Sequence, residues 1–281
     1  MFPDLGSKYT FIKEIGKGGT GAVNLAIDNH TGYQVAIKSI FKSVLIHNPE
    51  MLKRFKIEAN IYLMLSHPNI VKLKNFILKD GAHLVMDYIE GKTLDEYIKT
   101  VTGPIPSEIA VAIIKDIASA IGYAHEKKIP IDGYDGVLHL DIKPSNILVS
   151  NIGEIKVIDY GISQGDNEDR MEEIMGSPMY MSPEQLKIES KLDKRSDIYA
   201  LGVLLHQMLT GKTPYSTSTQ REVLFDNILN QPLERIINSY PHVDNRYQSI
   251  IDKATSKKPS ERYISCTDFV NSLEELTYEN N

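Results

Sequence analysis

The sequence is organised around His139-Leu140-Asp141-Ile142-Lys143-Pro144-Ser145-Asn146 and Ile158-Asp159-Tyr160-Gly161. These two stretches set two acids, one lysine and one amide at fixed offsets between short apolar runs. Asp141 could orient an attacking hydroxyl group and accept its proton. Lys143 could neutralise the charge of a phosphoryl group in transfer, and Asn146 and Asp159 offer the oxygen ligands that Mg²⁺ takes alongside phosphate oxygens. The pattern therefore predicts that these loop residues take part in the transfer of a phosphoryl group.

The composition of the whole chain is that of a soluble globular protein. Its 281 residues are 42% hydrophobic and 24% charged, and the net charge of −6 argues against nonspecific binding to nucleic acid. A single cysteine, Cys266, excludes an internal disulfide framework and is compatible with a reducing compartment. The start, Met1-Phe2-Pro3-Asp4, does not resemble a signal peptide, and no run approaches the roughly 20 apolar residues of a membrane span. We expect a cytoplasmic protein.

A glycine-rich stretch stands near the start of the chain. It reads Ile15-Gly16-Lys17-Gly18-Gly19-Thr20-Gly21-Ala22-Val23. Glycines let the backbone approach phosphates closely, but this spacing alone is equally compatible with an ordinary glycine-rich hairpin. A dinucleotide-binding fold would need a helix directly after the glycines. The run from Val23 to Ile27 continues as a strand instead, which fits a hairpin that covers a ligand.

Two charged residues follow on a predicted strand and a predicted helix. In Val35-Ala36-Ile37-Lys38, period-two alternation puts Ala36 and Lys38 on one face. A helix is predicted from Pro49 to about Leu65, with Asn48 as its N-cap, and Glu58 lies at the edge of its apolar stripe. By themselves, Lys38 and Glu58 are as compatible with solvated surface positions as with a functional pair.

Taken together and in this order, the motifs resemble those of a protein kinase of the eukaryotic-like serine/threonine type. The resemblance covers about residues 9 to 275 and implies an α+β, bilobal fold with a small antiparallel sheet and a larger helical lobe. It implies a single kinase domain over 1–281, with the N-lobe at 9–88, the hinge at 89–91 and the C-lobe at 92–276. MgATP would bind in the cleft between the lobes.

The resemblance also assigns roles to residues. Asp141 and Lys143 are the expected catalytic residues, and Asn146 and Asp159 the expected Mg²⁺ ligands. Lys38 would contact the α- and β-phosphates and form an ion pair with Glu58. The remaining ATP contacts are expected from the glycine-rich stretch (Ile15, Gly16, Lys17, Gly18, Gly19, Thr20, Gly21, Ala22, Val23), from Ala36 and Leu148 on the two sides of the adenine, from Met86 as gatekeeper, and from the backbones of Asp87 and Ile89.

The rest of the chain reads as mainly helical after Gly91. Ser107 is predicted to cap a core helix with Ile109, Ile113, Ile117 and Ile121 on its buried face. Another apolar helix is predicted from Ser196 to near Gly211. By resemblance, Asp197 on this helix holds the catalytic-loop backbone, and Glu184 pairs with the distant Arg262.

Two segments depart from the family pattern or carry unusual charge. The chain has about eight extra residues between His125 and His139, and we expect an exposed loop at 130–137 that could bind a regulatory partner. Asp132 and Asp135 in this loop suggest calcium, but the ligand set of an EF-hand is incomplete. The segment from Ile162 to Met181 resembles an activation loop; it is rich in acids and contains Ser177, which would contact the catalytic residues.

Leucine stands at position 140, where most of the family has an arginine that binds a phosphate on the activation loop. Leu140 has no donor for a phosphate, so we predict activity that does not depend on activation-loop phosphorylation (a non-RD kinase). Lys143 and Ser177 favour serine/threonine substrates in proteins, and the Met181–Gln185 stretch resembles bacterial kinases. A nucleotide-binding pseudokinase scaffold and a small-molecule kinase remain as alternatives, and the oligomeric state is open.

Overall fold

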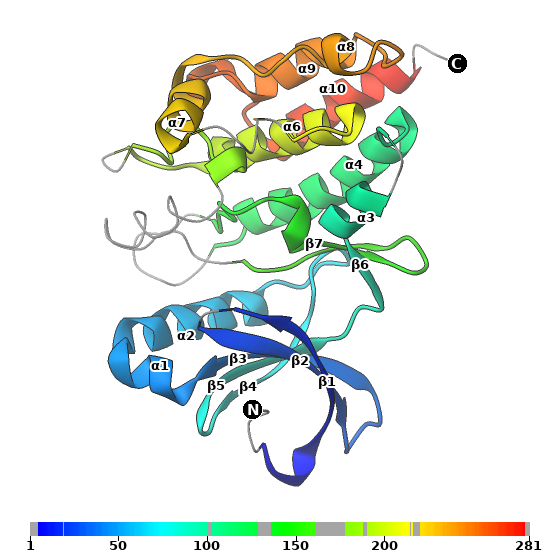
Figure 1. Cartoon of the computed structure of the whole chain (residues 1–281). Coiled ribbons are helices and arrows are strands. Elements are labelled where there is room, and N and C mark those ends of the chain that lie inside the picture. The colour runs from blue at the N-terminus through cyan, green and yellow to red at the C-terminus, as the bar shows by residue number, and fades with distance from the viewer. Residues whose placement is uncertain are drawn as a thin grey trace. The chain divides into compact units, whose positions relative to one another are not determined.

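The computed structural model describes residues 5–18, 20–100, 103–128, 136–160, 178–187, 190–213, 215 and 220–278. The chain forms two compact units that divide after Glu90 (Figure 1). The first unit is built on a sheet and the second mainly on helices. Each carries its own set of the predicted functional residues.

A five-stranded antiparallel sheet forms the frame of the first unit. Its strands are β1 (Tyr9–Lys17), β2 (Gly21–Asp28), β3 (Gln34–Phe41), β4 (Leu73–Leu78) and β5 (Gly81–Asp87), in the order β1-β2-β3-β5-β4. A short 3₁₀ helix, η1 (Gly6–Lys8), precedes them. Asp80 and Gly81 take positive φ values of 52° and 142°, which lets β4 turn directly into β5. β4 and β5 are therefore joined by a tight turn and pair along most of their length.

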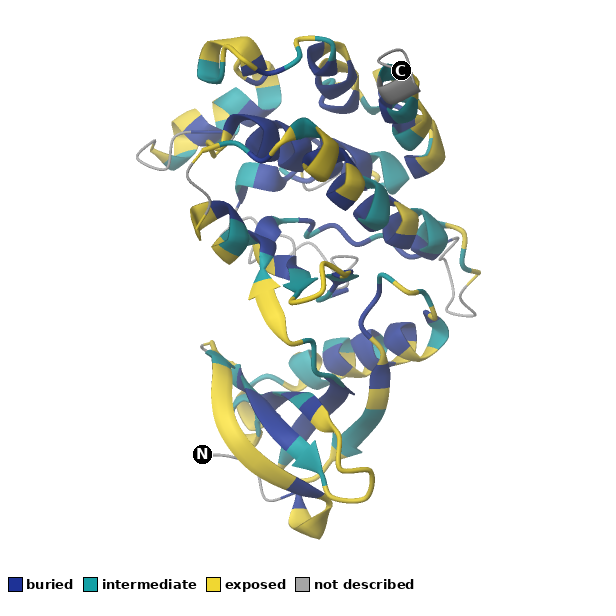
Figure 2. Cartoon of the chain, turned by 90° about the vertical axis from the view of Figure 1, so that its right-hand side faces the viewer, coloured by how far each residue is buried: buried dark blue, intermediate teal, exposed yellow. Residues whose placement is uncertain are grey.

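Burial in the sheet is uneven. β1 is exposed along most of its length, whereas β2, β3 and β5 are largely buried (Figure 2). One compact core cluster joins the start of the chain to the sheet through Leu5, Tyr9, Ala26, Val35, Ile37 and Val85. This packing makes the central strands a firm base for any side chain that they present.

Two helices follow β3 in the first unit. The short α1 (Lys42–His47) was not predicted, and α2 (Pro49–Met64) was. The side chain of Asn48 accepts a hydrogen bond from the backbone N–H of Met51 at 3.3 Å, which confirms it as the N-cap of α2. α2 contacts β4 and β5, so its buried face is fixed against the sheet.

The second unit begins with a three-stranded sheet in the order β6-β7-β8. The strands are β6 (Gly91–Thr93), β7 (Ile147–Ser150) and β8 (Ile155–Val157). β7 and β8 form an antiparallel hairpin, and Gly153 at its turn has a φ of 84°. The 3₁₀ helix η2 (Pro144–Asn146) leads directly into β7.

Helices make up most of the second unit. They are α3 (Leu94–Thr100), α4 (Ser107–His125), α6 (Lys194–Thr210), α7 (Arg221–Asn230), α8 (Ile236–Ser239), α9 (Tyr247–Ala254) and α10 (Cys266–Tyr278), with short 3₁₀ turns η3 (Pro178–Tyr180) and η4 (Pro259–Glu261). α6 is buried from Ser196 to Thr210 and contacts α4 and α9. A helix buried on all sides forms the centre of a core. Its end at Gly211, with a φ of 67°, was predicted.

The predicted start of α4 was wrong in detail. Pro106 occupies the N-cap position, and Ser107 is already the first helical residue, without a side-chain capping bond. Ile109 is 45% exposed, whereas Ile113, Ile117 and Ile121 are buried as predicted.

Among the described helices, none has the length and apolarity that crossing a bilayer requires.

Candidate functional site

The glycine-rich stretch joins β1 to β2 in the first unit. Ile15, Gly16 and Lys17 end β1, whereas Gly21, Ala22 and Val23 begin β2, and Gly18 N–H donates a hydrogen bond to Gly21 O at 2.9 Å. Thr20 lies in the turn, and Gly19 lies outside the described residues. The connection is thus a strand–turn–strand hairpin, as predicted, and not the strand–helix turn of a dinucleotide-binding fold.

Position 21 requires glycine because β2 lies very close to β3 there. A Cβ atom at this position would lie 1.8 Å from the backbone oxygen of Ser39 on β3. Only glycine lets β2 pass this close to β3. The backbone of this end of the hairpin is therefore held against the sheet by a contact that no other residue type permits.

Lys38 and Glu58 form the predicted ion pair within the first unit. Lys38 Nζ lies 2.8 Å from Glu58 Oε1, and the side chains are 28% and 10% exposed. β3 supplies the lysine and α2 the glutamate. Lys38 pairs across strands with Val23, and Ala36 pairs with Leu25. Glu58 is therefore not a solvated helix acid, and its pairing fixes the lysine beside the start of β2.

The end of β5 contains the residues expected to meet adenine. Met86 is buried and pairs with Ala36 on β3. The backbone N–H of Asp87 donates a hydrogen bond to Lys72 O at 3.0 Å, and the Asp87 carboxylate lies 2.7 Å from Lys74 Nζ. Ile89 follows the strand and is half-buried. Because its N–H group is already engaged, Asp87 could offer only its carbonyl oxygen to a ligand.

In the second unit, the carboxylate of Asp141 binds two other side chains of the predicted catalytic loop. Asp141 Oδ2 accepts hydrogen bonds from Lys143 Nζ at 2.7 Å and from Asn146 Nδ2 at 2.8 Å. Asn146 Nδ2 also donates to the backbone oxygen of Asp141 at 2.9 Å. The carboxylate of Asp141 stays 37% exposed, so it can still reach another molecule. Three of the four predicted catalytic and metal-binding residues of this unit therefore meet at one point.

Asp197 on α6 holds the backbone of this loop, as predicted. Its Oδ2 accepts from the N–H of His139 at 2.9 Å, and its Oδ1 accepts from the N–H of Leu140 at 2.7 Å. His125 Nε2 donates a third hydrogen bond to this carboxylate at 2.7 Å. Burial would raise the pKa of Asp197, but the hydrogen bond and the electrostatic interaction with His125 and the contacts with His139 outweigh it, and the pKa is lowered.

Asp159 directly follows Ile158, whose backbone makes hydrogen bonds with this loop. The N–H of Ile158 donates to Asn146 O at 3.0 Å, and His139 Nε2 donates to Ile158 O at 3.1 Å. Asp159 itself takes a φ of 56°, which is rare for a residue other than glycine. Strain of this kind is typical of functional positions. The predicted metal ligands Asn146 and Asp159 are thus joined through the intervening Ile158.

Tyr160 preserves the packing expected of an aromatic residue after Asp159. It is fully buried, and its ring centroid lies 4.7 Å from that of His139 at an interplanar angle of 53°. Its hydroxyl lies 3.5 Å from the carbonyl oxygen of Ala120 on α4. The ring and the hydroxyl group of Tyr160 are therefore both held inside this unit. Leu148, on the neighbouring β7, is half-buried.

The long-range pair predicted for the second unit is also present. Arg262 donates from Nη1 to Glu184 Oε1 at 2.6 Å and from Nη2 to Glu184 Oε2 at 2.8 Å. Burial alone would raise the pKa of Glu184, but these bonds and the hydrogen bond from Ser196 lower it. The pair ties the segment after residue 177 to the loop between η4 and α10.

One buried residue of this segment was missed by the sequence reasoning. Gln185 Nε2 donates a hydrogen bond to the backbone oxygen of Leu140 at 2.8 Å. No spacing rule points to this contact, and the only signal in the sequence is an amide directly after the predicted ion-pair partner Glu184. Several other predicted features, namely Gly161, Ser177, the acidic stretch from 162 and the Asp132–Asp135 pair, lie outside the described residues.

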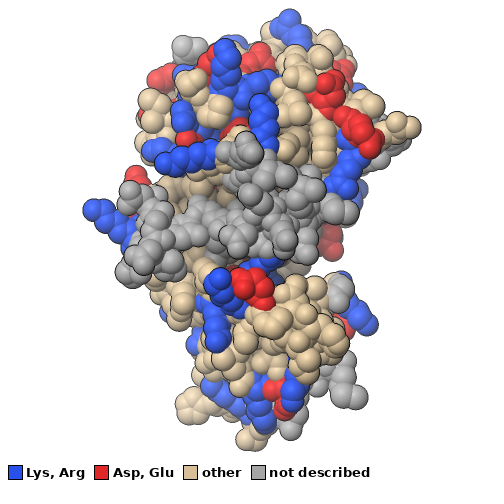
Figure 3. Space-filling model, turned by 90° about the vertical axis from the view of Figure 1, so that its left-hand side faces the viewer, with Lys and Arg blue, Asp and Glu red and all other residues tan. Residues whose placement is uncertain are grey.

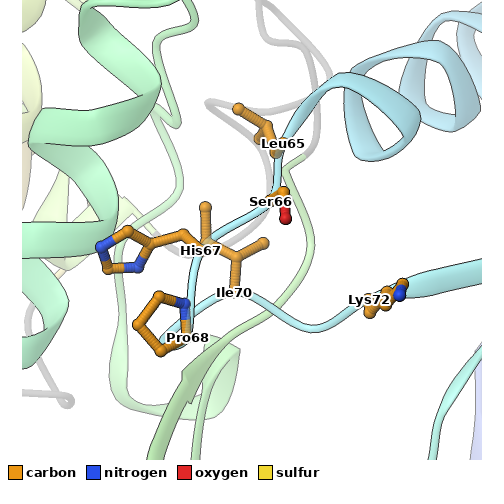
Figure 4. A pocket seen from close by; sticks show the side chains of 6 residues that line it. All are labelled: Leu65, Ser66, His67, Pro68, Ile70 and Lys72. Carbon is orange, nitrogen blue, oxygen red and sulfur yellow. The ribbon is translucent and has the colours of Figure 1, made fainter.

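A hollow of roughly 280 Å³ lies on the first unit between α2 and β4. Its lining consists of Leu65, Ser66, His67, Pro68, Ile70 and Lys72 (Figure 4). None of the predicted site residues lines it.

The surface charge is mixed in sign: both units carry basic and acidic side chains on the face drawn in Figure 3. This face does not present the one-sided positive surface typical of nucleic-acid binding.

Known protein kinases are similar to this chain over nearly its whole length. The family model described as "Protein kinase domain" matches residues 9–273. The chain is 36% identical over 269 residues to serine/threonine-protein kinase PrkC of Bacillus subtilis, covering 94% of this chain and 40% of that protein. It is 34% identical over 282 residues to a probable serine/threonine-protein kinase of Clostridium perfringens, covering 99% and 39%. The chain therefore spans about two fifths of the length of these curated relatives.

Among solved structures, the fold is similar to that of the PknI kinase domain of Mycobacterium tuberculosis. The TM-score is 0.72 at 23% sequence identity, and the match covers 96% of each chain. This likeness confirms the predicted α+β fold class, with its antiparallel sheet and helical part.

Proposed function

The chain belongs to the protein kinase domain family, and from this premise we propose that it transfers the γ-phosphate of MgATP to serine and threonine hydroxyl groups of proteins. The observation that carries the proposal is the cluster of Asp141, Lys143 and Asn146 on one loop whose backbone is held by Asp197. Phosphoryl transfer depends mainly on positioning and on electrostatic stabilisation, and a rigidly held loop supplies both.

Asp141 and Lys143 are the proposed catalytic residues. The exposed carboxylate of Asp141 orients the substrate hydroxyl group and accepts its proton. Lys143, 2.7 Å from that carboxylate, stabilises the negative charge of the phosphoryl group as it is transferred. A lysine two residues after the aspartate is the arrangement of serine/threonine kinases, and this supports specificity for those hydroxyl groups.

The family resemblance assigns ATP contacts to residues in each unit. Lys38, held by Glu58, would contact the α- and β-phosphates, and the backbone from Ile15 to Val23 would cover them. Asp87 would accept a hydrogen bond from the adenine through its carbonyl oxygen, and Ile89 would donate one. Met86, Ala36 and Leu148 would border the adenine ring. This assignment, like the division into lobes at 9–88 and 92–276 with a hinge at 89–91, rests on the family resemblance.

The residues present fit a magnesium ion. Asn146 uses its amide nitrogen for both of its side-chain hydrogen bonds, which turns its carbonyl oxygen away from Asp141. That oxygen and the Asp159 carboxylate form the oxygen donor set that Mg²⁺ takes with phosphate groups. When bound, the ion would supply positive charge that offsets the charge of the phosphate groups. Asn146 would hold the ion and Asp141 in one arrangement.

We further propose that activity does not require a phosphate on the activation loop. Leu140 is 4% exposed and has no side-chain donor, so it cannot bind a phosphate as an arginine does. Regulation would then come from a protein partner, with the loop at 130–137 as the proposed contact, or from expression; Gly136 and Val137 at the end of this loop are buried and not exposed as predicted. We place the domain in the cytoplasm, where the thiol of Cys266 stays reduced and ATP is supplied.

Incubation with labelled ATP and Mg²⁺ distinguishes the candidate activities. We expect label on seryl and threonyl residues of a generic basic protein such as histone. Label on an aminoglycoside without label on protein would identify a small-molecule kinase. Nucleotide binding without any transfer would identify a pseudokinase scaffold, and either outcome would overturn the proposal.

A second experiment tests independence from loop phosphorylation. Protein treated with a phosphatase, then freed of the phosphatase, should phosphorylate histone at the rate of untreated protein, with removal of phosphate verified by mass spectrometry. A large loss of the initial rate would contradict the proposed role of Leu140.

A further inference from the structure

Leu140 has a strained backbone at the centre of the catalytic loop. Its φ of 59° lies in the left-handed region, and the residue is 4% exposed. An L-residue with a branched side chain adopts this conformation only where its surroundings enforce it. Both of its backbone polar groups are buried, so each needs a hydrogen-bond partner. The orientation of Asp141, the next residue, depends on how this peptide is held.

The two polar groups of Leu140 are held by two different parts of the second unit. Its N–H group donates to Asp197 on α6 at 2.7 Å. Its carbonyl oxygen accepts from Gln185 Nε2 at 2.8 Å. Asp197 thus fixes the peptide that precedes Leu140, and Gln185 fixes the peptide that joins Leu140 to Asp141.

The amide of Gln185 is itself oriented. Its Oε1 atom accepts from the backbone N–H of Ser182 at 2.9 Å and from the Ser182 hydroxyl at 3.1 Å. Two donors on Oε1 leave Nε2 directed at Leu140. Both residues are buried, with Gln185 6% and Ser182 0% exposed.

The segment that carries Gln185 is anchored on its other side. The neighbouring Glu184 binds Arg262, and the Gln185 N–H donates to Ser182 O at 3.0 Å, which closes a turn. A displacement of this segment would therefore pull on the Leu140 carbonyl through a short, buried bond. This segment follows the proposed activation loop in the chain.

On the basis of the proposed function, we propose that Gln185 is a positioning residue, which holds the Leu140–Asp141 peptide and couples the segment after the activation loop to the catalytic loop without a phosphate. In kinases with an arginine at position 140, a phosphate and the arginine side chain make a connection of this kind. In this chain a neutral amide and the backbone carbonyl of Leu140 make the connection without a phosphate.

The test uses two variants and a matched control. Gln185→Met keeps the size of the side chain and removes all of its hydrogen bonds, whereas Gln185→Glu keeps the acceptor for Ser182 and loses the donor for Leu140. Gln248→Met is the control, because Gln248 is equally buried in the same unit and bonds to Ile236 and Asp252 instead. Histone phosphorylation and binding of a nonhydrolysable ATP analogue are measured for each folded variant.

We expect kcat to fall about 10- to 100-fold in both Gln185 variants, because small misplacements of catalytic groups have effects of this size. KM for ATP and analogue affinity should stay within about 3-fold, which marks loss of transition-state positioning and not of binding. Gln248→Met should retain kcat. A kcat within about 2-fold of the parent in Gln185→Glu, or an equal loss in the control, would overturn the role of Gln185.

Hydrogen exchange provides a readout without turnover. The amides of Leu140 and Asp141 should exchange faster in both Gln185 variants, whereas amides of α9 should not. Unchanged protection at Leu140 and Asp141 would refute the proposed contact even if the parent were inactive. An inactive parent with the expected exchange pattern would instead refute the proposed function and leave the role of Gln185 in holding the loop intact.

Discussion

Removal of Arg262 should destabilise the second unit strongly. Arg262 is 3% exposed and donates five hydrogen bonds, two to Glu184 and three to the backbone oxygens of Arg195, Ser256 and Lys257. Glu184 is 7% exposed, and Arg262→Met would leave its carboxylate without this cation. The Ser196 hydroxyl would still donate a hydrogen bond to it. The perturbation therefore creates an uncompensated buried charge.

The expected cost follows from this burial. Breaking a buried ion pair by removing one partner costs about 3–5 kcal/mol. In a unit of this size, each kcal/mol lowers the midpoint temperature by about 2–4 °C, so Arg262→Met should lower it by about 10 °C. The neighbouring Lys258–Glu261 pair offers a matched control, because its side chains are 77% and 54% exposed. Lys258→Met should cost less than about 1 kcal/mol.

Urea unfolding and differential scanning calorimetry measure both variants. The double variant Glu184→Met/Arg262→Met should be more stable than Arg262→Met alone, because it removes the stranded charge together with its partner. A cost below about 1 kcal/mol for Arg262→Met, or a double variant less stable than the single one, would refute the reasoning from burial.

Three further predictions concern other parts of the molecule. Gly21→Ala should lower the free energy of unfolding by about 1–3 kcal/mol, whereas Gly18→Ala, with open space at its Cβ position, should change it little; urea titration measures both. Lys38→Met should reduce the kcat for histone phosphorylation at least about 100-fold, because a positioned cation is lost, and a rate near that of the parent would contradict its role. Burial lowers the pKa of His206 below 6.5 despite its hydrogen bond to a backbone carbonyl, so the unfolded chain takes up this proton at higher pH than the folded chain. Stability should therefore fall as the pH drops below 6.5, and His206→Gln should reduce that slope in unfolding titrations between pH 7.5 and 5.5.

Much of the site follows from local spacing in the sequence. The offsets between Asp141, Lys143 and Asn146 are short, so a single loop and one 3₁₀ turn are enough to bring their side chains within reach of one another. The Lys38–Glu58 pair spans a strand and a helix, and it could be predicted because family resemblance supplied the register. The same holds for Glu184 with Arg262.

Features that depend on the direction of a single peptide could not be predicted in this way. The role of Gln185 depends on where the Leu140 carbonyl points, and that direction follows from a positive φ that no leucine implies by itself. The start of α4 depended on how the chain leaves the preceding turn, which made Pro106 the N-cap in place of Ser107. The exposure of Ile109 depends on which neighbours cover the first turn of α4, and periodicity does not contain that information.

The role of Asp141 in orienting the substrate hydroxyl group and accepting its proton is measured by single-turnover phosphorylation of histone by Asp141→Asn. We expect a rate constant at least about 100-fold below that of the parent, with MgATP-analogue affinity unchanged. Asp244→Asn, which alters a carboxylate paired with Arg246, is the control and should transfer phosphate at the parent's rate. Transfer by Asp141→Asn at the parent's rate would contradict the account.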